Sequence, residues 1–516
     1  MKFSAFAAVL AGSVLIVPFA SQAKDLTIGL AASTTSMDPQ FYVVGPNSAM
    51  ARNIFDGLVN QNEKQQIEPA LAVSWKTIDD TTWEFKLREN VKFHDGSDFD
   101  AEDVVASIKR IPLASTNSPS SFAAYVKAIT DVTAVDPLTV RITTDGPTPL
   151  LLNNLSRIAI LPAEMEKTTT EDMNKGKGVI GTGPFKFVSW SPDDHVVLAR
   201  NDTYWGEKAA WDKVTFRVFK NSSARVAAML SGDVDMIESI PTADTRRMEA
   251  ADKLNVVNVA GNRIMYLHMD QVREESPFSK DADGKNPLLK VQVRRAMSLS
   301  INRKAIVDRI MDGQGVPAGQ VVPEGYFGYD SAIKIDAYDP NKAKQLLADA
   351  GYPEGFNLTF HASNDRYPND SKVAQALGQF FSRIGIKTEV ATLPGSVYFT
   401  RASNQEFSLI MGGAAVETGE ASGVLGPILE TYGDKAGQGN RGRYSNAEFD
   451  KALSEARATL DDAKREDLLK KATETAMHDL GVIPLFYLAN TWALKQDLSF
   501  AGRSDGYTLP YYVKPN

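Results

Sequence analysis

The sequence predicts a mixed α/β protein, and three observations lead to that prediction. Several short segments alternate apolar and polar residues with the period of a β-strand. Longer segments with helical spacing lie between them and begin at recognisable capping residues. The chain of 516 residues contains no repeat of fixed period and no low-complexity tract, which favours a globule built from elements of ordinary length. That length predicts roughly two or three domains.

The first 23 residues have the form of an export signal. Lys2 precedes an apolar stretch over residues 3–20, and Ser21-Gln22-Ala23 puts small residues where a signal peptidase reads the chain. A membrane anchor is the competing interpretation, but polar residues follow at once, and no later stretch approaches the roughly 20 apolar residues of a spanning helix. We therefore expect export, cleavage after Ala23 and a mature chain that does not span the membrane.

The composition limits the cellular location and the binding partners that we expect for this protein. The chain contains no cysteine, so neither disulfides nor a lipid-modified N-terminal cysteine is expected, and stability must come from a hydrophobic core. With the export signal, this predicts a monomer that is free in the periplasm and has no lipid anchor. The formal net charge of -8 argues against a nucleic-acid partner.

The strand predictions rest on period-two patterns. Residues 26–30 form the first predicted mature strand, and Trp83, Phe85 and Leu87 alternate with charged residues as in a strand that is buried on one face and solvated on the other. Asp95-Gly96 then predicts a turn. The same reasoning predicts strands at 196–198, 214–219, 265–267 and 358–360.

The helix predictions rest on caps. Asp100 with Asp103 can accept from the free amides at the start of a helix that follows the 83–87 strand. Further helices are predicted after Asn302, after Asp339, and at Ser445, where Glu448 would complete a capping box. The most loop-like stretches are residues 273–287 and 436–443.

Seven segments resemble, in order and spacing, the extracytoplasmic solute-binding proteins of dipeptide, oligopeptide and nickel ABC transporters, which form solute-binding protein family 5. The segments are residues 69–110, 181–190, 200–205, 293–318, 338–356, 443–453 and 483–494.

The resemblance implies a periplasmic-binding-protein-like clamp of type II, large and two-lobed, with mixed sheets flanked by helices and an extra inserted subdomain. The implied boundaries are residues 24–47, 179–268 and 489–516 for lobe I, 48–178 for the inserted subdomain and 269–488 for lobe II. The resemblance also implies that a small solute is held in the cleft, that the lobes close over it, and that the closed form docks on an inner-membrane ABC permease. Closure can be driven only by a ligand that binds the closed form more tightly.

The family pairs a peptide's amino group with an aspartate that follows a Gly-Trp segment. At that place this chain has Gly413, Ala414 and then Glu417, so the tryptophan is missing and the acid is one methylene longer. The resemblance implies that Glu417 meets an amine of the ligand, with a solvated loop carboxylate as the alternative. The lost ring removes a wall of the site, which argues against a plain dipeptide.

Other candidates follow from the same resemblance. Arg366 stands where dipeptide-binding relatives bind the ligand's carboxylate, which a guanidinium can do bidentately, with an ordinary surface arginine as the alternative. Tyr367 and Tyr398 are candidate ring walls or core residues. Thr34 and Ser36 follow the first strand, where relatives contact ligand from lobe I, although such residues also form plain turns. Arg441, in a basic cluster with Asn440 and Arg443, faces either an anionic ligand, solvent or a structural salt bridge.

No cofactor, metal site or catalysis is expected. Residues 437–442 match G-x-G-x-x-G but follow a polar loop and not a strand. The five histidines are widely spaced, unlike the ligands of tetrahedral metal sites. The predicted function is capture of a peptide or peptide-like solute for an ABC importer. The alternatives are an opine-like conjugate, an oligosaccharide or a metal chelate as ligand and, more remotely, a secreted hydrolase, for which no nucleophile motif is present.

Overall fold

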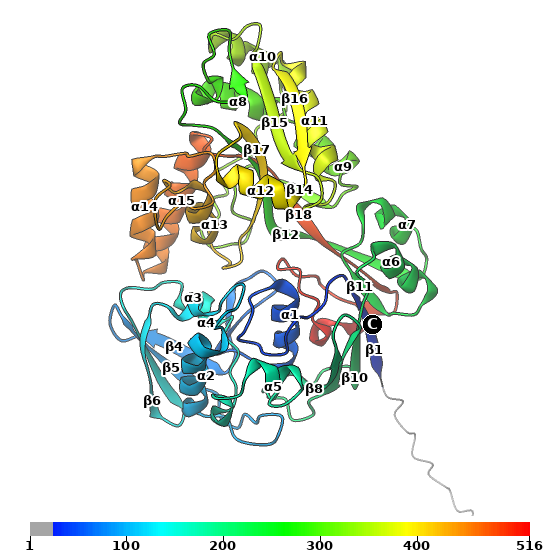
Figure 1. Ribbon diagram of the computed structural model, residues 1–516. Helices are drawn as coiled ribbons and strands as arrows, with labels where there is room; N and C mark the ends of the chain where they lie inside the picture. The colour runs from blue at the N-terminus through cyan, green and yellow to red at the C-terminus, as the bar shows by residue number, and fades with distance from the viewer. Residues whose placement is uncertain (1–23) are drawn as a thin grey trace, which may run out of the picture.

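The computed structural model describes residues 24–516, so the predicted export signal lies outside the described residues. The chain folds into a two-lobed clamp of mixed sheets and flanking helices (Figure 1). Lobe I and the inserted subdomain form the lower half of the view, and lobe II forms the upper half. Within the described residues, no helix combines the length and the apolar character that crossing a membrane requires.

One 12-stranded sheet runs through both lobes, in the order β13-β15-β17-β12-β18-β11-β1-β10-β9-β8, with β14 beside β18 and β16 beside β15. Its lobe I strands are β1 (Asp25–Leu30), β8 (Phe185–Ser191), β9 (His195–Arg200), β10 (Lys213–Val218) and β11 (Met236–Glu238). Its lobe II strands are β13 (Ser279–Lys280), β14 (Gly315–Pro317), β15 (Asn357–Ser363), β16 (Lys387–Leu393) and β17 (Leu409–Ala415). Two long strands, β12 (Leu254–Met269) and β18 (Ile483–Lys495), belong to both lobes.

The inserted subdomain has a four-stranded sheet of order β4-β5-β7-β6 and a separate β2-β3 pair. Its strands are β2 (Val59–Gln61), β3 (Ile67–Pro69), β4 (Ala72–Thr77), β5 (Thr82–Leu87), β6 (Ile129–Asp136) and β7 (Thr139–Thr144). Near the C-terminus, β19 (Leu498–Ser499) pairs with β20 (Lys514–Pro515).

The helices flank these sheets (Figure 1). Those before residue 250 are α1 (Gly45–Ile54), α2 (Ala101–Ala114), α3 (Ala123–Val126), α4 (Leu151–Leu155), α5 (Thr170–Asn174), α6 (Ser222–Ser231) and α7 (Thr245–Glu249). Those of lobe II are α8 (Val291–Ser300), α9 (Arg303–Arg309), α10 (Pro340–Asp349), α11 (Asp370–Arg383), α12 (Gly395–Ser403), α13 (Ser422–Leu429), α14 (Ala447–Arg457) and α15 (Asp462–His478). Short 3-10 turns occur at Ala163–Met165, Thr242–Asp244, Pro287–Leu289 and Pro510–Tyr512.

The two lobes have separate cores, and the chain passes between them within β12. Val257 and Val259 pack against the lobe I core, whereas Met265 and Leu267 belong to the lobe II core. The β12-β18 register breaks between these groups, since Ala260 pairs with Ala489 and Ile264 with Tyr487. The crossing therefore lies at residues 261–263 of β12 and beside 488 of β18, a short distance before the predicted boundary at 268. The domain boundaries stay predictions.

The caps form largely where the sequence places them. The Asp100 side chain accepts from the Glu102 amide and Asp103 accepts in return from the Asp100 amide, so the predicted helix start is confirmed and the two residues form a capping box. Asn302 and Asp339 cap α9 and α10 as predicted.

Two local predictions were wrong. The cap of α14 is Asn446 and not Ser445, because the helix begins at Ala447, and the Ser445 hydroxyl instead accepts from Thr431. On β5, Glu84 is buried although its position in the alternation predicts exposure. The strand register explains this, since Glu84 lies opposite Lys76 of β4 and Arg141 of β7 and pairs with both.

Candidate ligand-binding site

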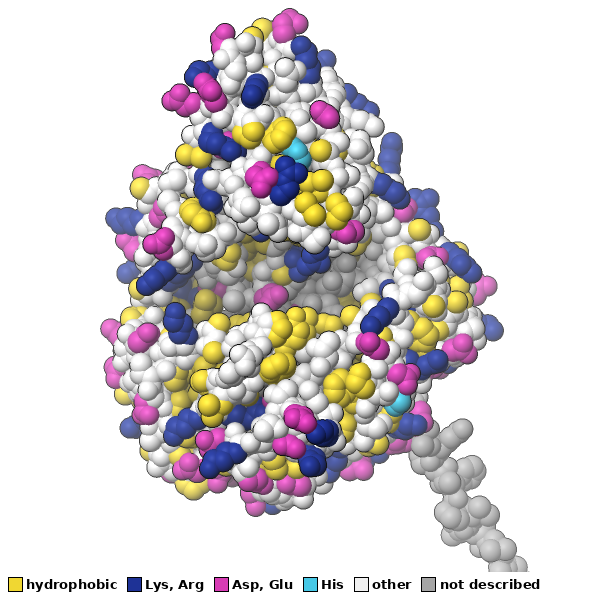
Figure 2. Space-filling view, in the orientation of Figure 1, with side chains coloured by type: hydrophobic (Ala, Val, Ile, Leu, Met, Phe, Trp, Pro, Cys, Tyr) yellow, Lys and Arg dark blue, Asp and Glu magenta, His cyan; other side chains and the backbone are white. Residues whose placement is uncertain are grey.

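A deep hollow separates the two lobes (Figure 2). Its walls come from the inserted subdomain and lobe I below and from the loops around β17 above. One part of it is lined by residues of both, including Trp75 and Leu152 of the inserted subdomain and Tyr326 and Phe327 of lobe II. A ligand placed there would touch both halves of the molecule.

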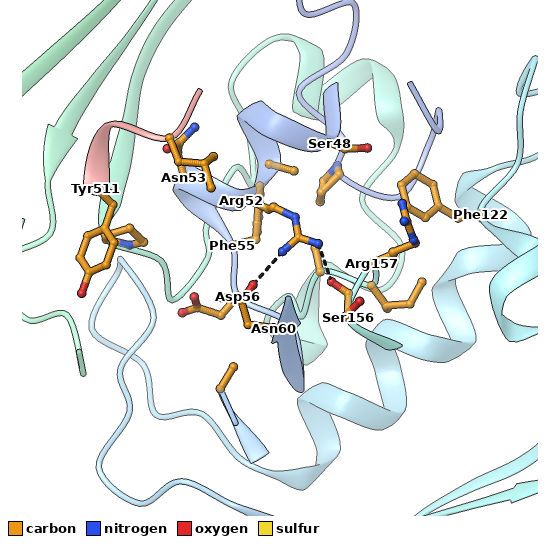
Figure 3. A pocket seen from close by; sticks show the side chains of 18 of the residues that line it. Ser48, Arg52, Asn53, Phe55, Asp56, Asn60, Phe122, Ser156, Arg157 and Tyr511 are labelled. Carbon is orange, nitrogen blue, oxygen red and sulfur yellow. Dashed lines mark hydrogen bonds between the residues drawn. The ribbon is translucent and has the colours of Figure 1, made fainter. Parts of the chain in front are cut away.

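A pocket adjoins this cleft from below (Figure 3). It lies where α1 ends and where the chain leaves α4, and it is lined by Phe122, Tyr125, Tyr204, Tyr511 and Tyr512 together with Arg52 and Arg157. The pocket encloses about 90 Å³, whereas one water needs about 10–15 Å³ on such a measure. It therefore has room for a single carboxylate or a small side chain, but not for a whole peptide.

Arg52 is held in this pocket by neutral acceptors. Its guanidinium donates to Asn60 Oδ1 at 2.7 Å and to the Ser156 carbonyl at 3.3 Å (Figure 3). Among the described residues, no carboxylate lies within 4.0 Å of it. Burial lowers the pKa of Arg52, but an arginine remains protonated in proteins. The pocket thus contains a cation that forms no direct ion pair, although Asp56 also lines the pocket and Asp505 acts on Arg52 from a longer distance.

Arg157 connects this pocket to lobe II. Its side chain is 9% exposed, its guanidinium lies 5.6 Å from the Tyr125 ring centre, and one nitrogen lies 3.6 Å from the Glu417 carboxylate. It also donates to the Glu417 carbonyl. Burial lowers the pKa of Arg157, but Tyr507, Tyr125 and Glu417 outweigh it and raise that pKa. The cation is therefore firmly held beside the cleft.

The predicted amine partner Glu417 lies in the turn after β17, with its side chain 55% exposed. The neighbouring Thr418 carbonyl accepts from Gln61 at 3.2 Å and from Asn153 at 2.6 Å, both in the inserted subdomain. Gly419 has φ +77° and its Cα approaches the Gln65 backbone so closely that a Cβ would lie 2.3 Å from that carbonyl oxygen. Residues 417–419 therefore bridge the cleft. A ligand contact for Glu417 stays a prediction.

Four predicted residues come together on the lobe II face. The Tyr367 hydroxyl donates to the Gly413 carbonyl at 3.3 Å, and the Arg366 guanidinium lies 5.2 Å from the Tyr367 ring centre. Arg441 lies 5.5 Å from the centre of the Phe399 ring, which packs edge-on against Tyr367 with ring centres 6.4 Å apart. The Arg366 guanidinium, the Tyr367 ring, the Phe399 ring and the Arg441 guanidinium therefore form a row in this order. Ala414, also predicted, follows Gly413 in β17.

The strand beside this row has an open edge. β17 pairs with β12 along its length but with β15 only at Leu409 and Ile410. Within the described residues, 411–415 therefore have no strand partner on that second edge. Gly413 could not carry a side chain without a shift of its neighbours, because a Cβ would lie 3.0 Å from the Tyr367 ring and 2.8 Å from the Met265 sulfur. Residues 413–415 are half-buried, and the carbonyls of Met411 and Gly413 already accept from the Tyr398 and Tyr367 hydroxyls.

The other candidates fill structural roles in this conformation. Tyr398 is fully buried and its hydroxyl donates to the Met411 carbonyl at 2.7 Å, which matches the core alternative. Thr34 and Ser36 are buried in the loop after β1, where the Ser36 hydroxyl lies 3.0 Å from Asn174 Oδ1. Asn440 donates to two loop carbonyls. Ligand contacts for Tyr398, Thr34 and Ser36 stay predictions.

The sequence reasoning missed Arg52, Arg157 and Arg263. Arg52 is an ordinary helical arginine in sequence, and Arg157 follows a short apolar helix without any motif. Arg263 stands at the lobe crossing, opposite Ala415 of β17. No local sequence motif identifies these three residues, because the residues that they contact come from distant parts of the chain.

The described residues contain no cluster of three or more histidine, aspartate or glutamate side chains that could hold a metal ion. His268 and His361 are buried and His94 is half-buried, and desolvation lowers the pKa of His94 and of His361 to about 4 and that of His268 to about 3. These groups belong to the packed interior, where they stay neutral at ordinary pH.

Comparisons with known proteins find a matching family and several similar proteins. Residues 66–436 match the profile of the bacterial extracellular solute-binding proteins, family 5. The chain is 29% identical to heme-binding protein A of Haemophilus influenzae over 88% of this chain and 85% of that protein. It is 30% identical to the glutathione-binding protein GsiB of Pectobacterium atrosepticum over 90% of this chain and 88% of that protein. Among solved structures, it resembles the periplasmic binding protein DppA of Helicobacter pylori in complex with the peptide STSA, with a TM-score of 0.72, 26% identity and coverage of 95% and 98% of the two chains.

Proposed function

The chain belongs to family 5 of the bacterial extracellular solute-binding proteins, and from this premise we propose that it binds a peptide or a peptide-like small solute in the cleft between its lobes. It is a substrate-binding component of an ABC importer, and it passes its ligand to the membrane permease of that system. Members of this family are transport binding proteins, and we assign no catalytic step to this chain.

The open edge of β17 is the main observation that supports a peptide-like ligand. Residues 411–415 offer backbone groups that β15 does not use, and an extended peptide can bind such an edge as an added strand. Main-chain hydrogen bonds of this kind tolerate different ligand side chains. Arg366 and Arg441 beside the edge would then bind a ligand carboxylate. The relatives named for glutathione and for the peptide STSA support this proposal.

Closure of the clamp follows from the way in which the lobes are joined. β12 and β18 cross between the lobes side by side, and their register break puts an irregular backbone at residues 261–263. A hinge needs a few residues that absorb backbone changes at such a place. We propose that rotation there brings the β17 edge toward Arg157 and the inserted subdomain, and that a ligand held by both faces stabilises the closed form.

Purification from the periplasm without denaturation, followed by native mass spectrometry and small-angle X-ray scattering, tests this function. We expect a bound small molecule, or a tested peptide, to lower the radius of gyration and to raise the melting temperature, since a ligand at 100 times its Kd stabilises the folded form by about 2.7 kcal/mol. An unchanged open shape with every peptide tested would contradict the proposal. Conversion of any bound compound into another would revive the secreted hydrolase.

The same experiment separates the alternatives within the family. An opine-like conjugate, an oligosaccharide or a metal chelate would each be recognised by its mass. The heme-binding relative makes a metal chelate the specific competitor. We further propose that the chain is exported, loses residues 1–23 by cleavage after Ala23, and acts as a monomer in the periplasm.

A further inference from the structure

Three arginines near the cleft, Arg52, Arg366 and Arg441, have no carboxylate partner among the described residues, although the protein as a whole is acidic. The chain has 64 acidic and 56 basic residues, and several of its buried arginines have carboxylate or carbonyl partners. Arg110 pairs with Asp38 at 2.7 Å and Arg503 with Asp505 at 2.8 Å. Arg225, which has no carboxylate partner, donates instead to three backbone carbonyls.

The cleft arginines are not saturated in this way. Arg366 donates no side-chain hydrogen bond to any described residue, and Arg441 donates one, to Ser403 at 3.2 Å. Arg52 uses two of its donors, the weaker at 3.3 Å. A guanidinium carries five N–H donors, so these three side chains have most of their hydrogen-bonding capacity free. Among the described residues, none of the three has a carboxylate within 4.0 Å.

These cations form two groups on opposite faces. Arg52 and Arg157 share the small pocket of the lower face. Burial is the main cause that lowers the pKa of Arg52; Arg503 and Arg157 lower it further, and Tyr507 and Asp505 raise it. Arg366 and Arg441 flank the two rings of the lobe II face. An anion placed in either group would relieve like-charge repulsion and satisfy free donors, and carboxylates match the guanidinium geometry.

Building on the proposed function, we infer that the ligand carries at least two carboxylates, one bound by Arg52 and Arg157 on the lower face and one bound by Arg366 or Arg441, which two rings separate, on the lobe II face. Each carboxylate would fix one lobe, so a diacid ligand joins the lobes when the clamp closes. The 90 Å³ pocket admits a carboxylate on a short stem and excludes a larger group. Glutathione and heme, for which two relatives are named, both carry two carboxylates.

A set of probes that differ in acid groups tests this inference. The diacids are glutathione, Glu-Ala-Ala and hemin, and the comparison compounds are glutathione diethyl ester, Ala-Ala-Ala and Lys-Ala-Lys amide. We expect at least one diacid to raise the melting temperature and to bind, by calorimetry, more than tenfold tighter than its esterified or neutral counterpart. Its affinity should fall with ionic strength.

Variants locate the two carboxylates. Arg52→Gln, and one of Arg366→Gln and Arg441→Gln, should weaken the diacid more than tenfold. A monoester of that diacid, made without the carboxylate that the substituted arginine binds, should lose less affinity. Arg309→Gln is the matched control, because Arg309 is an exposed arginine at the end of α9, outside the cleft. Arg52→Lys keeps the charge and should retain part of the affinity. Circular dichroism and the melting temperature without ligand check that each variant folds.

The outcomes distinguish this inference from the proposed function. Tight binding of Ala-Ala-Ala or the diester with closure of the clamp would overturn the diacid inference and leave the transport function intact. Absence of stabilisation by every diacid would also overturn it. If a ligand is co-purified, methyl esterification followed by mass spectrometry counts its acid groups, and a count below two overturns the inference.

Discussion

The Arg157 guanidinium of the inserted subdomain lies 3.6 Å from the Glu417 carboxylate of lobe II, and this contact spans the cleft. The two residues come from segments 260 positions apart. The bridge keeps residues 417–419 against the inserted subdomain before any ligand is bound. It also places the chain's own acid beside an arginine that a ligand carboxylate would use.

Glu417→Gln tests this bridge. Because the glutamate is 55% exposed, the pair contributes less than about 1 kcal/mol to folding, and we expect the free energy of unfolding in urea to stay nearly unchanged. The ligand-free form should open further in small-angle scattering. If Glu417 also meets a ligand amine, an amine-bearing ligand should bind more than tenfold weaker, whereas its N-acetylated form should bind both proteins equally. Identical scattering and identical affinities would exclude both roles.

Gly261→Ala tests the crossing between the lobes. A Cβ at this position would lie 2.6 Å from the Leu488 carbonyl oxygen, a backbone atom that cannot move without changing the β12-β18 pairing. We expect a loss of about 1–3 kcal/mol in the free energy of unfolding, as for other overpacked sites, and a changed equilibrium between open and closed forms. Urea unfolding and scattering measure the two effects.

Gly146→Ala is the matched control for this variant, because a Cβ there would have nothing within 4 Å. Equal stabilities of the two variants would show that the crossing tolerates a side chain and would remove residues 261–263 as the hinge.

The pH dependence of stability follows from the buried histidines. His94, His268 and His361 have folded-state pKa values of about 4, 3 and 4, below the usual 6.5, and burial is the main cause for each. The unfolded chain therefore binds more protons between pH 6.5 and about 4, so stability is complete above pH 6.5 and falls as the pH drops through this range. Three carboxyls oppose this effect, because burial raises the pKa of Asp103 to about 6 and also raises the pKa of Asp56 and of Glu238.

The histidines therefore lower the free energy of unfolding as the pH falls from 6.5 to 5, whereas the three carboxyls raise it. His268→Gln, which keeps a donor for the Ile428 carbonyl, removes one histidine contribution, so we expect this variant to lose less stability than the wild type between pH 6.5 and pH 5. Urea titrations of both proteins at four pH values in this range measure the difference. The same pH dependence in both proteins would contradict the assignment of a neutral buried His268.

Local rules explain why much of the fold was predictable. The Asp100 and Asn302 caps and the period-two strands depend on residues within a few positions of one another, so the sequence contains the whole signal. Ser36 shows the limit of such rules. A hydroxyl after a strand can face a ligand or form a hydrogen bond within a loop. In this structure the Ser36 hydroxyl lies within hydrogen-bonding distance of Asn174, which is 138 positions away, and no local pattern predicts that contact.

The resemblance points to Arg366 and Gly413, and the structure brings them together with Tyr367 and Arg441, although a ligand contact for each of these residues stays a prediction. Arg157 could not be found in this way, since its role depends on a partner in the other lobe.

Arg366→Ala provides the sharpest test of the lobe II face. The side chain is exposed and has no ion-pair partner among the described residues, and its contact with the Tyr367 ring at 5.2 Å is worth about 0.5–1 kcal/mol at an exposed site. We therefore expect the melting temperature without ligand to change little. Truncating one partner of a buried charge pair costs about 2–5 kcal/mol, so a carboxylate ligand that closes the clamp should bind at least tenfold weaker. Calorimetry with the wild type, Arg366→Ala and the control Arg309→Ala measures this. A large loss of stability without ligand would instead make Arg366 a structural residue, and unchanged affinity would move the carboxylate site away from it.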